Sequence, residues 1–168
     1  MNRVLLSLGS NIDPESHLRA AVRLLAERCR LLAVSPVYET APVGKTDQPP
    51  FLNAAAWVET PLTAAQLKVA LADIEQQLGR QRGIDKNAAR TIDLDITLFN
   101  EAVFDLAGRH IPDPELLQYA YIAVPAADLA PQQRHPETGQ TLSKIAHRLA
   151  PGPDDIKPRP DIRLETEG

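Results

Sequence analysis

Apolar and polar side chains alternate between residues 90 and 100, and this alternation restricts the fold more than any other feature of the chain. The apolar positions are Ile92, Leu94, Ile96 and Leu98, and the polar positions are Thr91, Asp93, Asp95 and Thr97. Successive side chains of a β-strand point to opposite faces of a sheet. We therefore predict a strand with one apolar face and one polar face, a pattern that is common in antiparallel sheets.

A strand, a tight turn and a helix are predicted at the N-terminus. The apolar run of residues 4–8 ends at Gly9, Ser10 and Asn11, which is typical of a buried strand followed by a turn. Asp13 and Pro14 then match an N-cap and a first helical position. The apolar stripe of this helix consists of Leu18, Ala21, Val22 and Leu25.

Two more strands and a second helix follow. Residues 31–40 and 52–60 favour strands, and the proline-containing segment 41–51 between them is expected to be a loop. Thr63 and Gln66 match a capping box, which predicts a helix whose apolar stripe is Leu67, Leu71, Ile74 and Leu78. The predicted order is that of the ferredoxin-like βαββαβ core. We expect an α+β fold with helices packed on the faces of an antiparallel sheet.

The C-terminal part is expected to add helices and then to lose order. One helix is predicted within residues 119–129, and an amphipathic helix carries Leu142, Ile145, Ala146 and Leu149. Residues 151–168 are rich in proline and charge and are expected to form a poorly ordered tail. Residues 1–150 then form a single domain, which fits a chain of 168 residues of which 43% are apolar.

Charge and cysteine content limit the classes of function. The net charge of −4 gives no general attraction to nucleic acid or to an anionic membrane, so neither partner is expected. Cys29 is the only cysteine and cannot form an intramolecular disulfide. The sequence has no signal-peptide pattern and no apolar run of membrane-spanning length. We expect a monomeric, cytoplasmic protein.

Asp93 and Asp95 are a candidate metal site. If the strand is regular, the two carboxylates share one face with Cα atoms roughly 6.5–7 Å apart. Neighbouring carboxylates repel each other, and such hard oxygen ligands suit magnesium ions bound together with phosphate oxygens. The alternative is an ordinary solvated strand face.

A basic segment precedes this strand and contains Arg80, Arg82, Lys86 and Arg90, opposed only by Asp85. Guanidinium groups suit phosphate oxygens, so the segment is a candidate anion site in an acidic protein. A charge-rich surface loop is the alternative. Cations for phosphate beside anions for magnesium are the combination used by phosphoryl-transfer sites.

Phe51, Asn53 and Trp57 share a face of the predicted third strand. An aromatic ring and an amide could hold a flat heterocycle by stacking and hydrogen bonds. Packing in the core is the alternative for Trp57.

The chain resembles the 6-hydroxymethyl-7,8-dihydropterin pyrophosphokinases, a family of folate biosynthesis, from about residue 4 to residue 131. The resemblance rests on four ordered motifs: LGSN at residues 8–11, YETAPVG at 38–44, DQP at 47–49 leading to FLNAA at 51–55, and RTIDLD at 90–95. It implies a pyrophosphokinase-like domain that binds a pterin and ATP with two Mg²⁺ ions. It also implies attack of the pterin alcohol on the β-phosphorus of ATP, with release of AMP.

The resemblance implies roles for individual residues. Asp93 and Asp95 correspond to magnesium-binding aspartates, and Glu75 to a helix residue near the nucleotide. The corresponding arginines of the phosphate site are Arg80, Arg82 and Arg90, of which Arg80 and Arg90 act in catalysis together with the two aspartates. The positions that correspond to the pterin pocket are Gly9, Thr40, Pro42, Val43 and Asn53, with Phe51 and Tyr121 on either side of the pterin ring.

Three sites depart from the common family pattern on the nucleotide side. Asp113 stands where a histidine is usual, Tyr119 where an arginine is usual, and Lys86 with Asn87 replaces an arginine followed by a large residue. Lys86 and Arg109 are the candidate replacement cations for ATP. The alternative for Tyr119 is a packed helix residue.

The leading hypothesis is an authentic pyrophosphokinase. The alternatives are a divergent paralogue that acts on a related pterin and a catalytically silent pterin-binding module. Asp93 and Asp95 argue against the silent module, because adjacent carboxylates without a metal would only repel each other.

Overall fold

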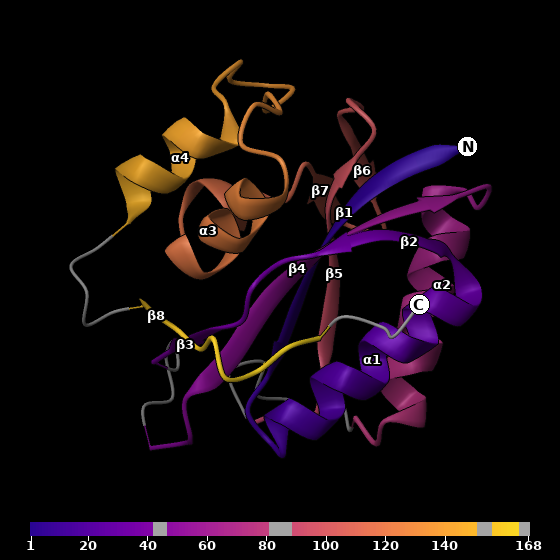
Figure 1. Cartoon of the computed structure of the whole chain (residues 1–168). Coiled ribbons are helices and arrows are strands. Elements are labelled where there is room, and N and C mark those ends of the chain that lie inside the picture. The colour runs from indigo at the N-terminus through magenta and orange to yellow at the C-terminus, as the bar shows by residue number, and fades with distance from the viewer. Residues whose placement is uncertain (42–46, 81–88, 151–155, 165–168) are drawn as a thin grey trace.

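An antiparallel sheet forms the centre of the protein (Figure 1). The structure is a computed structural model, and it describes residues 1–41, 47–80, 89–150 and 156–164. In these ranges the sheet has six strands in the order β5-β1-β4-β3-β8, and β2 also pairs with β4. The strands are β1 (Asn2–Ser10), β2 (Arg30–Val34), β3 (Tyr38–Thr40), β4 (Phe51–Thr60), β5 (Asp93–Phe99) and β8 (Ile156–Pro158). The predicted ferredoxin-like α+β fold is confirmed.

Helices α1 (Pro14–Arg28) and α2 (Ala64–Gln77) cover one face of the sheet (Figure 1). The apolar stripe predicted for α1 is buried in full, and Leu67, Leu71 and Ile74 of α2 are buried with it. The capping box at Thr63 and Gln66 is confirmed by hydrogen bonds in both directions. Asp13 occupies the N-cap position of α1 and Pro14 begins the helix, as predicted. The Asp13 side chain makes no capping hydrogen bond, and its backbone is left-handed with φ 46°.

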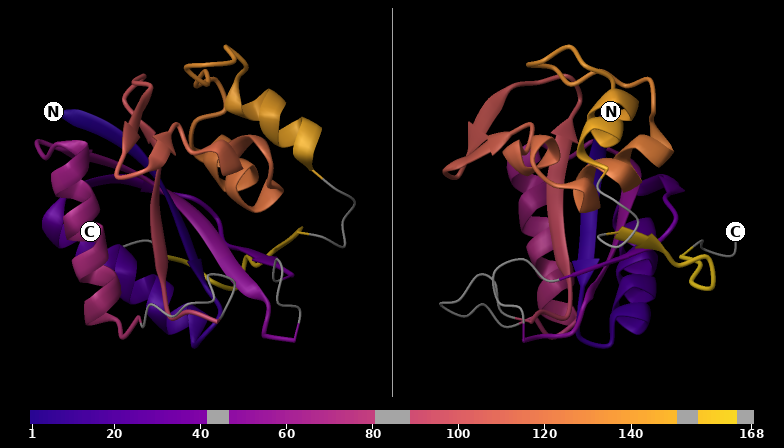
Figure 2. Two further views of the ribbon diagram at one scale, coloured as in Figure 1. Left: turned by 180° about the vertical axis from the view of Figure 1, so that it is seen from behind. Right: turned by 90° about the vertical axis from the view of Figure 1, so that its left-hand side faces the viewer.

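Helices α3 (Ala120–Leu129) and α4 (Leu142–Leu149) lie on the opposite side of the sheet, as the left view in Figure 2 shows. A short 3-10 helix, η1 (Pro114–Leu117), leads into α3, and a hairpin of β6 (Phe104–Leu106) and β7 (Arg109–Ile111) precedes it. A second apolar cluster fills this side, and Trp57 packs against it. Trp57 therefore takes the core-packing role. No helix in the described ranges is long and apolar enough to cross a membrane.

The predicted strand at residues 31–40 is two strands. β2 and β3 both pair with β4, and Ser35 to Val37 separate them. Pro36 has no N–H to donate to the sheet. The Ser35 side chain maintains the contact, because the N–H of Ala55 donates to Ser35 Oγ at 2.8 Å.

A bulge at Thr97 changes the faces of β5. Leu5 of β1 pairs with Leu98, but the next residue, Leu6, pairs with Ile96. Thr97 is therefore an extra residue, and Leu98 packs in the α3 cluster instead of with Leu94 and Ile96. The prediction that Leu98 shares their face is wrong, since an inserted residue reverses the later side chains.

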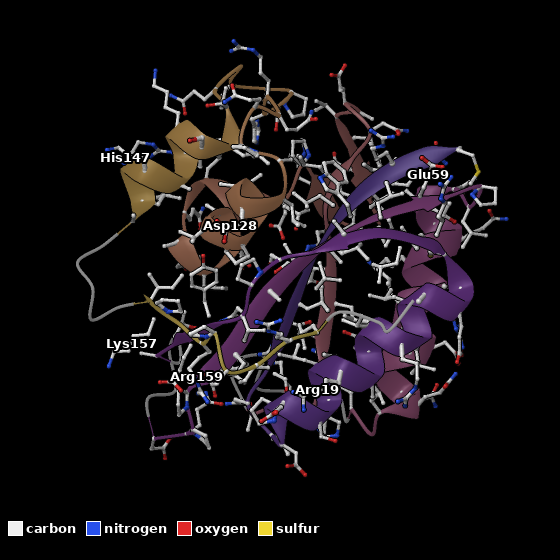
Figure 3. The ribbon with its side chains drawn as sticks, viewed as in Figure 1. Arg19, Glu59, Asp128, His147, Lys157 and Arg159 are labelled. Atoms are coloured by element: carbon white, nitrogen blue, oxygen red, sulfur yellow. The ribbon has the colours of Figure 1, made fainter. Side chains whose placement is uncertain are left out.

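The C-terminal segment is ordered where a disordered tail was expected. β8 pairs with β3, and the N–H of Arg159, labelled in Figure 3, donates to Val37 O at 2.8 Å. Ile162 and Leu164 are 4% and 5% exposed and belong to the core cluster that also contains the buried side chains of α1 and α2. The expectation of poor order is wrong for residues 156–164, because these apolar side chains anchor the segment. Residues 151–155 and 165–168 lie outside the described residues.

Candidate functional site

A cavity of about 410 Å³ opens on the α3 side of the sheet and extends around the edge strand β5 to α2. Its floor is formed by side chains of β1, β4 and β5, and one wall by Tyr121 and Ile122 of α3. Arg109 of the β6–β7 hairpin and Lys68 and Glu75 of α2 line the other end. The cavity is therefore lined by both aromatic and charged side chains.

Gly9 lies at the centre of the floor. In β1 it pairs with Asn53 of β4 on one side and with Asp93 of β5 on the other. A Cβ atom at this position would lie 3.1 Å from Asn53 Oδ1, which is closer than an ordinary contact. The nearly buried Asn53 amide also donates from Nδ2 to Thr40 Oγ1 at 2.7 Å, so its orientation is determined by β1 and β3 together.

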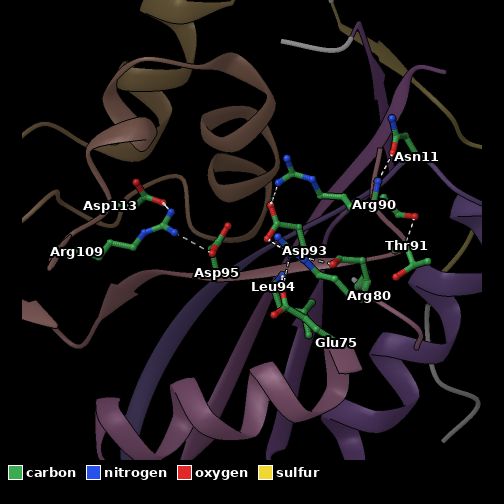
Figure 4. Close-up of polar contacts among 12 residues, drawn as sticks. Asn11, Glu75, Arg80, Arg90, Thr91, Asp93, Leu94, Asp95, Arg109 and Asp113 are labelled. Carbon is green, nitrogen blue, oxygen red and sulfur yellow. Dashed lines mark hydrogen bonds and ion pairs between the residues drawn. The ribbon is translucent and has the colours of Figure 1, made fainter. Parts of the chain in front are cut away.

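Asp93 accepts hydrogen bonds from two arginines (Figure 4). Arg80 Nη1 lies 2.7 Å from Asp93 Oδ1, and Arg90 Nη1 lies 2.8 Å from Oδ2. Burial would raise the pKa of Asp93, but the two guanidinium groups outweigh burial and hold this pKa below its ordinary value. Asp93 is therefore an anion at neutral pH.

Glu75 fixes Arg80 from the α2 side. Glu75 Oε2 accepts from Arg80 Nη1 at 2.9 Å and from the N–H of Leu94 at 2.9 Å. Since Leu94 is the residue between Asp93 and Asp95, this carboxylate connects α2 to the strand that carries both aspartates. Arg80 also donates to Ile92 O at 3.1 Å.

Asp95 has a different environment from Asp93. Among the described residues its side chain accepts a hydrogen bond from Arg109 Nη1, at 3.1 Å. Burial and the negative charge of Asp93 raise the pKa of Asp95 to about 7, although Arg109 partly opposes them. The two carboxylates thus repel each other across the cavity floor.

The two aspartates fit a magnesium site that is completed by other oxygen ligands. Among the described residues, no group of three or more histidine, cysteine or acidic side chains could hold a metal ion. Mg²⁺ is commonly bound by one or two carboxylates together with water and phosphate oxygens. A bound cation would also relieve the repulsion that raises the pKa of Asp95.

Aromatic side chains also line the cavity. Phe51 and Tyr121 both line it, and the guanidinium carbon of Arg90 lies 5.7 Å from the centre of the Phe51 ring. Tyr119 stacks on Tyr121 with ring centres 5.2 Å apart and planes 22° apart. These rings offer flat surfaces in the same cavity as the Asn53 amide.

A family model described as 7,8-dihydro-6-hydroxymethylpterin-pyrophosphokinase matches residues 5–131. The chain belongs to this pyrophosphokinase family. The match runs from within β1 to just beyond α3 and includes every cavity residue described above.

Several relatives carry pyrophosphokinase names. The chain is 39% identical over 148 residues to the Pseudomonas aeruginosa 2-amino-4-hydroxy-6-hydroxymethyldihydropteridine pyrophosphokinase, and the match covers 86% of this chain and 90% of that protein. The Bacillus subtilis protein of the same name is 38% identical over 134 residues, with coverage of 78% and 80%. The folic acid synthesis protein of Schizosaccharomyces pombe is 38% identical over 147 residues, which are 86% of this chain but only 20% of that longer protein.

Solved structures share the fold of the pyrophosphokinase family. The Plasmodium falciparum HPPK-DHPS protein with pterin and p-hydroxybenzoate has a TM-score of 0.70 to this chain at 16% identity. The similar region is 88% of this chain and 41% of that one. At this identity the likeness concerns the fold alone.

Most of the pyrophosphokinase site residues predicted from the sequence line the cavity. They are Gly9, Thr40, Phe51, Asn53, Glu75, Arg80, Arg90, Asp93, Asp95, Arg109 and Tyr121. Pro42, Val43, Arg82 and Lys86 lie outside the described residues.

Sequence reasoning missed several residues at the cavity. Ala72 and Lys68 line it one and two turns before the position of Glu75, a helical spacing that could have revealed both. Glu115 and Ser7 have no comparable signal. Asn11 was part of a recognised motif, but its role was missed: its Oδ1 accepts from the N–H of Arg90 at 2.8 Å (Figure 4).

Proposed function

We propose that ATP and 6-hydroxymethyl-7,8-dihydropterin meet in this cavity and react above the floor formed by Gly9, Asp93 and Asp95. As a member of its family, the chain is an ATP-dependent pyrophosphokinase of folate biosynthesis. The proposal rests chiefly on one observation: Gly9 lies between the Asn53 amide and the Asp93 carboxylate, so a flat heterocycle and a metal-bound phosphate chain can lie side by side.

The pterin occupies the part of the cavity lined by aromatic side chains. Phe51 and Tyr121 stack against its two faces, and the Asn53 amide bonds to its polar edge. The hydrogen bond between Asn53 and Thr40 supports this role, because it fixes the amide before the ligand arrives. Gly9 allows close approach of the ring, and Pro42 and Val43 complete the pocket.

ATP occupies the part of the cavity lined by charged side chains. Arg80, Arg82 and Arg90 neutralise phosphate oxygens, while Lys86 and Arg109 replace the cations usual in the family. Glu75 holds Arg80 at the cavity wall, which its hydrogen bond of 2.9 Å supports. Asp93 and Asp95 would hold two Mg²⁺ ions, which supply charge neutralisation and alignment of the phosphates.

The reaction exchanges one phosphorus–oxygen bond for another. The pterin hydroxyl oxygen bonds to the β-phosphorus of ATP, the bond from that phosphorus to the oxygen bridging the α-phosphorus breaks, and AMP leaves with the electron pair. The hydroxyl proton is released, so the products are the pterin diphosphate, AMP and one proton. The arginines stabilise charge on the transferred group, and the walls of the cavity limit its contact with water. A monomeric enzyme acting in the cytoplasm is part of this proposal.

The test is a turnover assay with purified protein, ATP, Mg²⁺ and 6-hydroxymethyl-7,8-dihydropterin, in which pterin products are separated by chromatography. We expect the pterin diphosphate to form and its formation to stop when EDTA is added. Pterin binding without any product would support the silent module instead. Asn53→Ala should raise the KM for the pterin and leave the KM for ATP unchanged.

A further inference from the structure

We propose that Asp113 is a positioning residue for nucleotide binding, because it holds the guanidinium of Arg109 at the cavity wall beside Asp95. This inference rests on the proposed function, in which Arg109 contacts ATP. It assigns a role to a residue that departs from the usual family pattern, where a histidine is common.

Asp113 is an anchored and buried anion. Its side chain is 2% exposed. Oδ2 accepts from Arg109 Nη2 at 2.9 Å, and Oδ1 accepts from the N–H of Glu115 at 3.0 Å. The N–H of Asp113 donates to Thr97 O of β5 at 3.0 Å. The carboxylate is therefore fixed both to η1 and to the strand that carries Asp95.

Arg109 connects this anchor to the cavity floor (Figure 4). While Nη2 bonds to Asp113, Nη1 bonds to Asp95 Oδ1 at 3.1 Å. The Arg109 side chain is 43% exposed and lines the cavity, whereas the side chain of its anchor is almost completely buried. A guanidinium has five N–H donors in a rigid plane, so donors remain for phosphate oxygens after both carboxylates are bonded.

The two carboxylates therefore have different roles toward Arg109. Asp95 faces the cavity, where a metal ion would compete with Arg109 for the Asp95 carboxylate and a phosphate would compete with Asp95 for the Arg109 guanidinium. Asp113 is removed from solvent, and a buried carboxylate without its cation is strongly unfavourable. If Asp95 is engaged by another cation, Arg109 keeps the bond to Asp113 and stays at the wall. Without Asp113, an exposed arginine on a three-residue strand is free to turn toward solvent.

Capping of η1 is the competing explanation for Asp113, since its side chain accepts from the N–H of Glu115. Asparagine and serine are also good N-caps. Asp113→Asn and Asp113→Ser therefore retain a cap and remove the negative charge that holds Arg109. Two variants also guard against a folding defect in either one.

The experiment measures binding of α,β-methylene-ATP with Mg²⁺ by titration calorimetry. This analogue cannot transfer its terminal pyrophosphoryl group, because carbon replaces the oxygen of the bond that breaks. The variants are Asp113→Asn, Asp113→Ser, Arg109→Ala and Arg109→Ala with Asp113→Asn. Asp105→Asn is the matched control, because Asp105 lies on the same hairpin with a side chain that is 78% exposed and does not line the cavity.

We expect each Asp113 variant to weaken analogue binding about three- to tenfold. This is less than the roughly ten- to hundredfold effect of removing a charged hydrogen bond to the ligand itself, because Arg109 is still present. In the Arg109→Ala background, Asp113→Asn should change analogue binding less than about twofold, since the residue it positions is gone. Pterin binding should be unchanged in all variants. Asp105→Asn should bind the analogue like the unsubstituted protein.

The positioning role would be overturned if Asp113→Asn weakened analogue binding equally in the presence of Arg109 and in the Arg109→Ala background. It would also be overturned if neither Asp113 variant weakened analogue binding. That result would leave the proposed function intact as long as the unsubstituted protein binds the analogue. Failure of the unsubstituted protein to bind it with Mg²⁺ would overturn both.

Discussion

Asn53 and Asp93 lie on either side of one residue of the central strand, Gly9, to which both are paired in register. Adjacent strands are about 4.8 Å apart, so the amide and the carboxylate come from strands about 10 Å apart. In the proposed function, this spacing would let a heterocycle at Asn53 present its hydroxymethyl arm to phosphates held near Asp93. Gly9 allows it because it carries no side chain between them.

Gly9→Ala should weaken pterin binding about tenfold, because its Cβ atom would lie 3.1 Å from Asn53 Oδ1 and displace the amide. Calorimetric titration with a pterin analogue measures this effect. Gly139→Ala is the control: Gly139 has a φ of 72°, so alanine is strained there, but it does not line the cavity. Similar pterin affinity in both variants would contradict the role of Gly9.

Asp95 should make the metal-free protein less stable as the pH rises. Its pKa is raised to about 7, so the folded state binds this proton more tightly than the unfolded chain does. The stabilising contribution is fully present below about pH 4 and is lost as the pH rises through about 7.

Asp95→Asn removes this titration. In EDTA at pH 8 its free energy of unfolding should exceed that of the unsubstituted protein by about 1–3 kcal/mol, because each pKa unit corresponds to about 1.4 kcal/mol and water in the cavity weakens the full effect. Urea unfolding at pH 4 and pH 8 measures the difference. The exposed Glu101→Gln is the control. A difference that is the same at both pH values would show that Asp95 does not titrate in this range.

Tyr119 should act through its stack with Tyr121. Tyr119→Ala removes a stacked pair worth about 0.5–1.5 kcal/mol, so pterin binding should weaken about two- to tenfold. Its side chain makes no capping hydrogen bond to α3, so the substitution removes no cap. Tyr119→Phe keeps a ring and should bind the pterin normally. Pterin titrations of both variants measure this effect. Equal pterin affinities of Tyr119→Ala and Tyr119→Phe would show that the stack does not contribute to pterin binding.

Ile162 should contribute to stability although it lies far along the chain from the helices it packs with. Ile162→Ala should lower the free energy of unfolding by about 2–4 kcal/mol, because a buried side chain leaves a cavity. Val69→Ala is the control, since Val69 is 71% exposed and should change stability by no more than about 0.5 kcal/mol. Equal urea unfolding midpoints for Ile162→Ala and Val69→Ala would mean that the C-terminal segment does not stabilise the core.

Local patterns predicted the elements that depend on local chemistry. The capping box of α2 and the apolar stripe of α1 involve residues within a few positions of each other, and both are confirmed. The bulge at Thr97 depends on pairing between β5 and β1, so alternation in β5 alone could not reveal it. Ile162 and Leu164 are isolated apolar residues in a charged, proline-rich stretch, and only the distant core explains their burial.

The candidate site shows the same division. Asp93 and Asp95 were recognised because two carboxylates on one strand face are visible in the sequence. Phe51 and Asn53 were recognised from their shared strand face and again from the family motifs. The contact of Asp113 with Arg109 and the stack of Tyr119 on Tyr121 depend on side-chain geometry that spacing does not determine. Both involve positions where the chain departs from the family pattern, so the motifs gave no guidance there.

The most direct measurement of the central claim is the nucleotide product formed from ATP labelled with ³²P at the α-phosphorus, with Mg²⁺ and 6-hydroxymethyl-7,8-dihydropterin present. Attack at the β-phosphorus predicts that the label appears in AMP in step with pterin consumption. Asp95→Asn should slow this step on the order of a hundredfold or more, because it removes an anionic metal ligand. Label appearing in ADP as the pterin is consumed would contradict pyrophosphoryl transfer.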